Sequence, residues 1–166
     1  MQIQRRGDGH HNWKLYEGAG RIGVEWYFRH STDLPTSVML YHLEPGAEEG
    51  EHFHLEGDPG SCSIVSEDEM YIVIAGEVVV TVADERAALR AGAAVYVPEG
   101  VPHGAQHESH ASAALLLLFG PPAGHPLRPA AGEGCACTSS RPTRAIRAAS
   151  TRPGPSRTCS VAPPPR

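Results

Sequence analysis

Residues with turn preference interrupt this chain about every 8 to 15 residues between positions 22 and 119, and this spacing limits the possible folds most strongly. The segments between the turns are short and rich in β-branched and aromatic residues, which favour strands. Such segments cover 24–30, 37–43, 69–83, 87–100 and 112–120. No amphipathic stretch of about 12 residues indicates a helix. The pattern therefore predicts an all-β sandwich or barrel.

The charge distribution divides the chain in two. Residues 1–120 carry 7 Lys/Arg against 18 Asp/Glu, whereas residues 121–166 carry 7 Arg and a single acid. The second part also holds 10 of the 15 prolines and no aromatic residue, so it cannot bury enough apolar surface to offset the entropy of ordering. We expect an N-terminal segment over 1–21, a β-barrel domain over 22–120 and a disordered, basic Pro/Arg/Ala-rich tail over 121–166.

Several classes of function are disfavoured by composition. The acidic first part has no basic face to neutralise phosphates, so we expect no nucleic-acid partner. The longest apolar run, 113–119, is far shorter than the roughly 20 residues that span a bilayer. The N-terminal residues contain no apolar run typical of a secretory signal, and three of the four cysteines lie in the tail. We therefore expect a cytoplasmic protein with no membrane partner and no disulfide framework.

Two histidines two residues apart, His52 and His54, form the first candidate site. On a strand both imidazoles point to the same face, where they need hydrogen-bond partners or a metal. Alone, such a pair also fits surface or hydrogen-bonded histidines. Glu69 opens a later apolar strand, and His103 follows a turn rich in Gly and Pro. Three imidazoles and one carboxylate suit one divalent transition metal per chain, either Fe, Mn, Ni, Cu or Zn.

The spacing of these residues resembles the cupin superfamily. Gly46, five residues, the pair His52 and His54, a spacer, Glu69, six residues and Gly76 resemble the first cupin motif. Gly92, five residues, Pro98-Glu99-Gly100, two residues, His103, three residues and His107 resemble the second motif. The resemblance covers about residues 36–119. It implies a small single-domain jelly-roll barrel whose metal ligands are His52, His54, Glu69 and His103.

The sequence departs from the family pattern at two places. The family has three or four residues between the second histidine and the glutamate, but here fourteen residues, 55–68, intervene. The spacing to Gly76 favours Glu69 as the ligand over Glu56, Glu67 and Asp68. His107 stands where the family usually has Asn, and we consider it for a supporting role beside the metal.

Other side chains are weaker candidates. Tyr41, His42, Cys62, Tyr71 and Tyr96 are predicted to contribute to a substrate pocket, although Tyr41 and His42 cannot both point inward from one strand. The acidic run Glu48-Glu49-Gly50-Glu51 is interpreted as a solvated loop whose field favours cation capture.

The resemblance implies a metal-dependent enzyme acting on a small organic molecule, a non-haem dioxygenase or a cyclase/isomerase of secondary metabolism. In either case the metal acts as a Lewis acid or redox centre. Glu69 could instead stay unligated and act as a general base. The alternative is a non-catalytic cupin that binds a small molecule or metal as a sensor or storage protein. Family analogy implies a homodimer.

Overall fold

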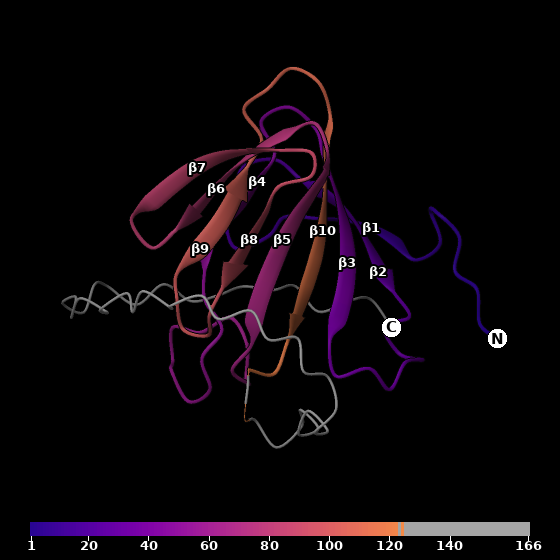
Figure 1. The fold of residues 1–166 in the computed structure, drawn as a ribbon, viewed down its shortest axis with the longest axis vertical. Helices are drawn as coiled ribbons and strands as arrows, with labels where there is room; N and C mark the ends of the chain where they lie inside the picture. The colour runs from indigo at the N-terminus through magenta and orange to yellow at the C-terminus, as the bar shows by residue number, and fades with distance from the viewer. Residues whose placement is uncertain (123, 125–166) are drawn as a thin grey trace, which may run out of the picture.

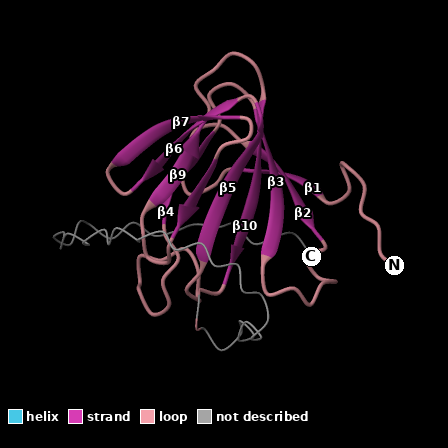
Figure 2. Cartoon of the chain, in the orientation of Figure 1, coloured by secondary structure: helices cyan, strands magenta, loops and turns pink. Residues whose placement is uncertain are grey.

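The computed structural model describes residues 1–122 and 124, and this part of the chain contains ten β-strands and no helix (Figures 1 and 2). The strands are β1 (His10–Trp13), β2 (Ile22–Tyr27), β3 (Ser37–Leu43), β4 (Glu48–His52), β5 (Asp68–Ala75), β6 (Glu77–Val82), β7 (Glu85–Arg90), β8 (Ala94–Val97), β9 (His103–Gln106) and β10 (Ala113–Gly120). The predicted all-β class is confirmed. The predicted disorder of the tail concerns residues almost entirely outside the described part.

The strands form two sheets that face each other across one core (Figure 1). The six-stranded sheet has the order β1-β2-β3-β10-β5-β8 and the four-stranded sheet the order β4-β9-β6-β7. Neighbouring strands within both sheets are antiparallel. Alternate residues of each strand point inward and fill the space between the sheets with apolar side chains, among them Ile22, Val24, Leu43, Val73, Val78, Leu115 and Leu117. The predicted jelly-roll barrel is confirmed.

The chain changes sheets at Gly76, between β5 and β6. The φ angle of Gly76 is +73°, a conformation that residues with a side chain rarely adopt. A Cβ atom at this position would also lie only 2.9 Å from the Cβ of Ala113. Glycine is therefore required where the predicted two-strand segment 69–83 turns from one sheet into the other.

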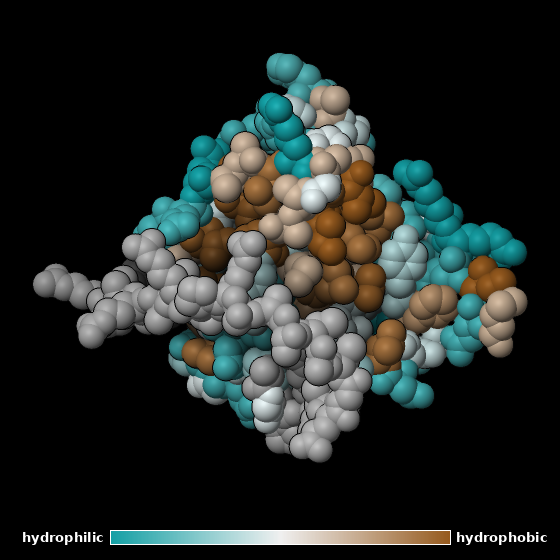
Figure 3. Space-filling model, in the orientation of Figure 1, coloured by the Kyte–Doolittle hydropathy of each residue, from teal (hydrophilic) through white to brown (hydrophobic). Residues whose placement is uncertain are grey.

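The outward face of the six-stranded sheet carries apolar side chains as well. Figure 3 shows hydrophobic residues gathered over β3, β10 and β5. Met70, Ile74 and Tyr96 on this face are 36%, 49% and 53% exposed. In the described part of the chain, no helix is long and apolar enough to cross a membrane.

Three strands lie outside the segments expected from the turn spacing: β1, β4 and β9, although the interpretation of the histidine pair allows a strand at His52. The interpretation of 48–51 as a solvated loop is wrong, because β4 begins at Glu48 and Glu49 is only 2% exposed. Because β4 contains Glu48, Glu49 and Glu51, its sequence lacks the alternation of apolar and polar residues that is typical of a half-buried strand. In addition, β2 ends at Tyr27 rather than at position 30, since Phe28 has a φ of +50° that breaks the ladder.

Candidate metal centre

Four predicted ligands come together inside the barrel. One potential ligand atom from each of His52, His54, Glu69 and His103 lies within 4.8 Å of the others. All four residues are buried, with exposed fractions between 2% and 6%. Buried imidazoles and a carboxylate at this separation fit the donor set of a transition-metal site, so the cluster could bind a metal.

Both sheets contribute to the cluster. His52 ends β4 and is paired with His103 at the start of β9, in the four-stranded sheet. Glu69 is the second residue of β5 in the opposite sheet and points inward because Tyr71 and Val73 on the same face are fully buried. His54 lies two residues beyond the end of β4. The prediction that the two histidines share one strand face therefore holds only for their direction, since the strand itself stops at His52.

Backbone carbonyls fix the orientation of two of the rings. Nδ1 of His52 lies 3.0 Å from Gly50 O, and Nδ1 of His103 lies 2.7 Å from Val101 O. A carbonyl can only accept a hydrogen bond, so each Nδ1 carries the proton and donates it. Nε2 then carries the free lone pair and could bind a metal, and the two Nε2 atoms lie 3.8 and 3.0 Å from Oε2 of Glu69. Such outer hydrogen bonds orient metal-binding histidines in general.

The third ring is held by the long insertion. Nε2 of His54 lies 3.1 Å from Glu69 Oε2, while its Nδ1 faces Glu67 Oε2 at 3.4 Å and Cys62 Sγ at 3.5 Å. Burial raises the pKa of Glu67 despite the opposing influence of the neighbouring imidazole. The insertion closes on itself through hydrogen bonds from Leu55 N to Ser61 Oγ and from Glu56 N to Ser66 Oγ. Its contacts with His54 make it part of the wall around the cluster.

Nε2 of all three rings faces Oε2 of Glu69, with His54 and His103 within hydrogen-bond distance and His52 at 3.8 Å. Burial alone would raise its pKa, but the neighbouring imidazoles of His103, His52 and His54 more than offset burial. They hold the pKa of Glu69 well below its usual range, so the carboxylate stays ionised at neutral pH and is available as a ligand.

A second buried carboxylate, Glu49, was missed by the sequence analysis. Tyr41 donates to its Oε1 at 2.9 Å and Tyr71 donates to its Oε2 at 2.7 Å. Burial raises the pKa of Glu49, and it also raises the pKa of both tyrosines well above 10. Two of the three predicted tyrosines, Tyr41 and Tyr71, therefore point into the barrel, where they hold this carboxylate. Of the pair Tyr41 and His42, Tyr41 is the inward residue.

Tyr16 is a second residue that the sequence did not indicate. Its ring is stacked on His52, with ring centroids 3.7 Å apart and planes 17° apart. Tyr16 and Glu17 both have positive φ angles, 47° and 59°, inside a turn closed by Gly18 N donating to Leu15 O at 2.8 Å. A side chain at Gly50 would collide with Tyr16 O, so glycine there allows the turn to approach β4.

The remaining candidates lie outside the cluster. His42 faces outward and lies 2.8 Å from Glu25, and Tyr96 is exposed and donates to Asp68 at 2.7 Å. His107 is fully buried beyond the far end of β9, where Nε2 contacts Ser109 Oγ at 2.9 Å. Its Nδ1 has no hydrogen-bond partner among the described residues. Of the weaker candidates, Cys62 lies 3.5 Å from Nδ1 of His54, and Tyr71 packs edge-on against His103 with ring centroids 5.9 Å apart.

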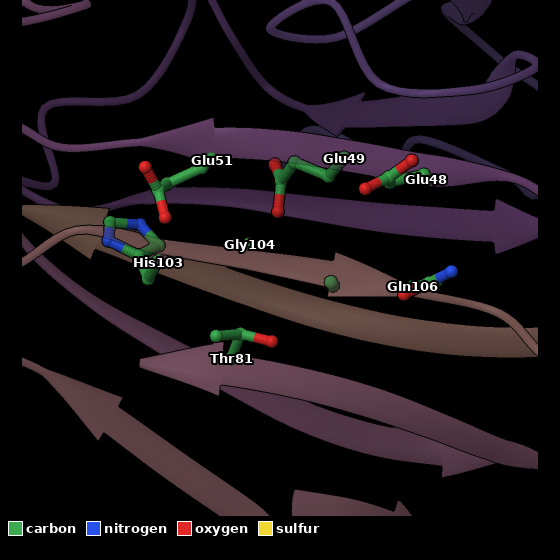
Figure 4. Close-up of a pocket in the computed structure, with 8 residues that line it drawn as sticks. Glu48, Glu49, Glu51, Thr81, His103, Gly104 and Gln106 are labelled. Carbon is green, nitrogen blue, oxygen red and sulfur yellow. The ribbon is translucent and has the colours of Figure 1, made fainter. Parts of the chain in front are cut away.

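A pocket lies beside the cluster, between β4, β9 and β6 (Figure 4). The pairing of β4 with β9 shifts register between Glu49 and His52, which loosens the ladder at this point. The lining includes Glu48, Glu49 and Glu51 on β4, with Thr81 on β6 and His103 on β9. The negative field of these acids favours cations near the cluster.

The chain is similar in sequence to known proteins. The family model described as Cupin domain matches residues 39–119. An uncharacterized protein of Streptomyces coelicolor is 31% identical over 96 residues, which cover 58% of this chain and 80% of that protein.

Two solved structures share the fold. A predicted oxalate decarboxylase from Thermotoga maritima has a TM-score of 0.62 at 18% identity, over 74% of this chain and 100% of that chain. A Cupin 2 conserved barrel domain protein from Salinispora arenicola has a TM-score of 0.55 at 17% identity, over 72% of this chain and 87% of that chain. Together with the family model and the sequence relative, they establish that this chain belongs to the cupin superfamily.

Proposed function

We propose that this protein is a metal-dependent cupin enzyme that acts on a small organic molecule, with non-haem dioxygenase chemistry as the first candidate. The observation that supports this most directly is the convergence of three Nε2 atoms on Oε2 of Glu69. Three nitrogens and one carboxylate oxygen would occupy four positions of an octahedral metal. Two positions would remain for substrate and O2, or for two oxygens of one substrate.

The residues of the chain have separate tasks in this proposal. His52, His54 and His103 supply neutral donors, and Glu69 supplies the negative charge. Gly50 O and Val101 O keep two of the rings in the ligating tautomer. When bound, the metal would supply Lewis-acid or redox chemistry to a coordinated substrate.

Glu49 is well placed to balance charge. With Glu69 it gives two buried carboxylates beside three neutral imidazoles, and a divalent ion would make this set electrically neutral. A neutral set costs less to bury than one with a net charge. We infer that the interior favours a divalent over a trivalent ion.

Elemental analysis of protein purified without a metal-affinity tag is the first test, followed by O2 uptake with phenols, catechols and thiols. Near-stoichiometric iron with substrate-dependent O2 uptake would support a dioxygenase. Zinc or nickel without O2 uptake would redirect the proposal to cyclase or isomerase chemistry. Metal below about 0.1 per chain that reconstitution cannot restore would refute the site. Full metal without turnover of any tested substrate would favour a sensor or storage protein.

A further inference from the structure

Both tryptophans of the chain lie on one side of the barrel, next to the histidine cluster. Trp26 packs edge-on against Trp13, with ring centroids 6.3 Å apart, and against Phe119 at 5.6 Å. Phe119 in turn is stacked on the cluster residue His54, at 6.4 Å and 11°. All three aromatic residues are only partly buried, although they pack against the core. A continuous aromatic surface therefore leads from the solvent to a predicted metal ligand.

A guanidinium group lies on this surface. The Arg29 Cζ atom is 4.2 Å from the centre of the Trp26 ring and 5.8 Å from that of Trp13. Two other arginines of the described chain, Arg86 and Arg90, pair with the acids Glu108 and Glu77, and Arg21 donates to the backbone carbonyl of Asn12. Arg29 has no carboxylate partner in the part that the structure describes, although residues 1–120 contain 18 acids. Stacking holds a guanidinium in place while its N–H edge stays free to bind a planar anion.

We propose that Trp13, Trp26, Phe119 and Arg29 form a binding subsite for a planar aromatic carboxylate. The aromatic ring of the ligand packs against Trp26 and Phe119, and its carboxylate accepts paired hydrogen bonds from Arg29. The acids around the cluster would repel an anion, so binding of one needs a cation nearby. Among the described aromatic contacts, Arg29 is the only side chain that places a cation on this surface. This extends the proposed function by naming a class of substrate, but the binding itself does not require the metal.

The two tryptophans make the test direct, because the chain has no others and both lie in the subsite. We would titrate the full chain, metal-free and metal-loaded, with benzoate and follow tryptophan emission. Uncharged benzamide and non-aromatic acetate serve as matched probes. We expect saturable binding of benzoate. Benzamide should bind about tenfold more weakly because it lacks the charge-assisted hydrogen bonds, and acetate about tenfold more weakly because it has no ring to pack against Trp26 and Phe119.

Substitution of Arg29 separates recognition from simple packing. Arg29→Gln should weaken benzoate binding about tenfold and leave benzamide binding unchanged, and Arg29→Lys should fall between the two. Arg90→Gln, a surface change on β7, is the control and should match the unmodified chain. Circular dichroism and the thermal midpoint confirm that each variant is folded.

The results of these titrations test the carboxylate subsite separately from the proposed metal-dependent activity. Equal affinities for benzoate and benzamide, or an Arg29→Gln variant that binds benzoate as before, would overturn the subsite whatever the metal content. Selective benzoate binding that disappears in Arg29→Gln would support the subsite even if no O2 uptake or other turnover were found.

Discussion

Two glutamates lie buried in the same barrel, and their surroundings shift their pKa values in opposite directions. Glu69 on β5 faces three imidazoles, which lower its pKa against the effect of burial. Glu49 on β4 accepts from two phenols, and there burial dominates and raises its pKa. Imidazoles can lose a proton and become ligands, whereas buried phenols cannot at neutral pH. The comparison indicates that the partners of a buried acid decide the direction in which its pKa shifts.

Replacing one of the four proposed ligands, including Glu69, should reduce metal affinity much more than replacing Glu49. Glu69→Gln and His103→Ala each remove one donor from a four-residue set. The affinity for metal should therefore fall more than about 100-fold, which is a larger loss than substitution of a residue that only supports the ligands would cause. Metal content by elemental analysis and titration with Co²⁺ measure the change. His107→Ala is the matched control, since it removes a buried histidine outside the cluster. A comparable metal loss in that variant would mean that the ligand set is wrong.

Replacement of the second carboxylate should have a smaller effect on metal. Glu49→Gln keeps the size of the side chain but removes a buried charge, so we expect roughly tenfold weaker binding of a divalent ion. Both phenols donate to the carboxylate, but an amide offers only one oxygen, so its NH2 group would face the second hydroxyl. We expect this mismatch to lower the unfolding free energy by about 1–3 kcal/mol. Competition with a chelator and urea denaturation measure the two effects. Unchanged metal affinity would exclude a role for Glu49 in charge balance.

The opposite pKa shifts predict opposite effects of pH on the stability of the metal-free protein. The lowered pKa of Glu69 gives stability that is present above the usual carboxyl value of 4.5 and is lost as pH falls. Burial would lower the pKa of His52, but the charges of Glu49 and Glu69 raise it above 6.5. That stability is present below pH 6.5 and is lost as pH rises through the raised value. The raised pKa of Glu49 acts in this second direction.

Maximum stability is therefore expected at weakly acidic pH, and denaturation in a chelator at several pH values would locate it. Glu69→Gln should flatten the acid limb of this profile, and Glu49→Gln should flatten the alkaline limb. If both variants kept the full profile, the contrast between the two glutamates would not be electrostatic.

The smallest expected effect is the loss of one phenol hydroxyl. Tyr41→Phe removes the donor to Glu49 Oε1 and should lower the unfolding free energy by about 1 kcal/mol. Metal content should stay the same, because Glu69 and the histidines are untouched. Thermal and urea unfolding of this variant, compared with Tyr71→Phe, would show whether the two hydroxyls are equivalent. A drop in metal content would place Glu49 closer to the ligands than its tyrosine partners suggest.

Prediction from sequence succeeded where a residue's role follows from local spacing. The strand at 37–43, the turn at Gly76 and the inward direction of Glu69 all follow from period-two alternation and glycine placement. It failed at Glu49, because a run of acids has no visible alternation. Tyr16 was missed for a different reason, since its contact with His52 joins residues 36 positions apart through a turn with unusual φ angles.

The sequence by itself determined the all-β class, the family and the four residues of the candidate metal centre, because strand periodicity and motif spacing are properties of neighbouring residues. Only the tertiary structure decided which atoms face the centre. The carbonyls that orient His52 and His103, the phenols around Glu49 and the aromatic row beside His54 come from separate strands. Their arrangement depends on how the two sheets pack against each other, and no pattern of neighbouring residues in the sequence specifies the distances between separate strands.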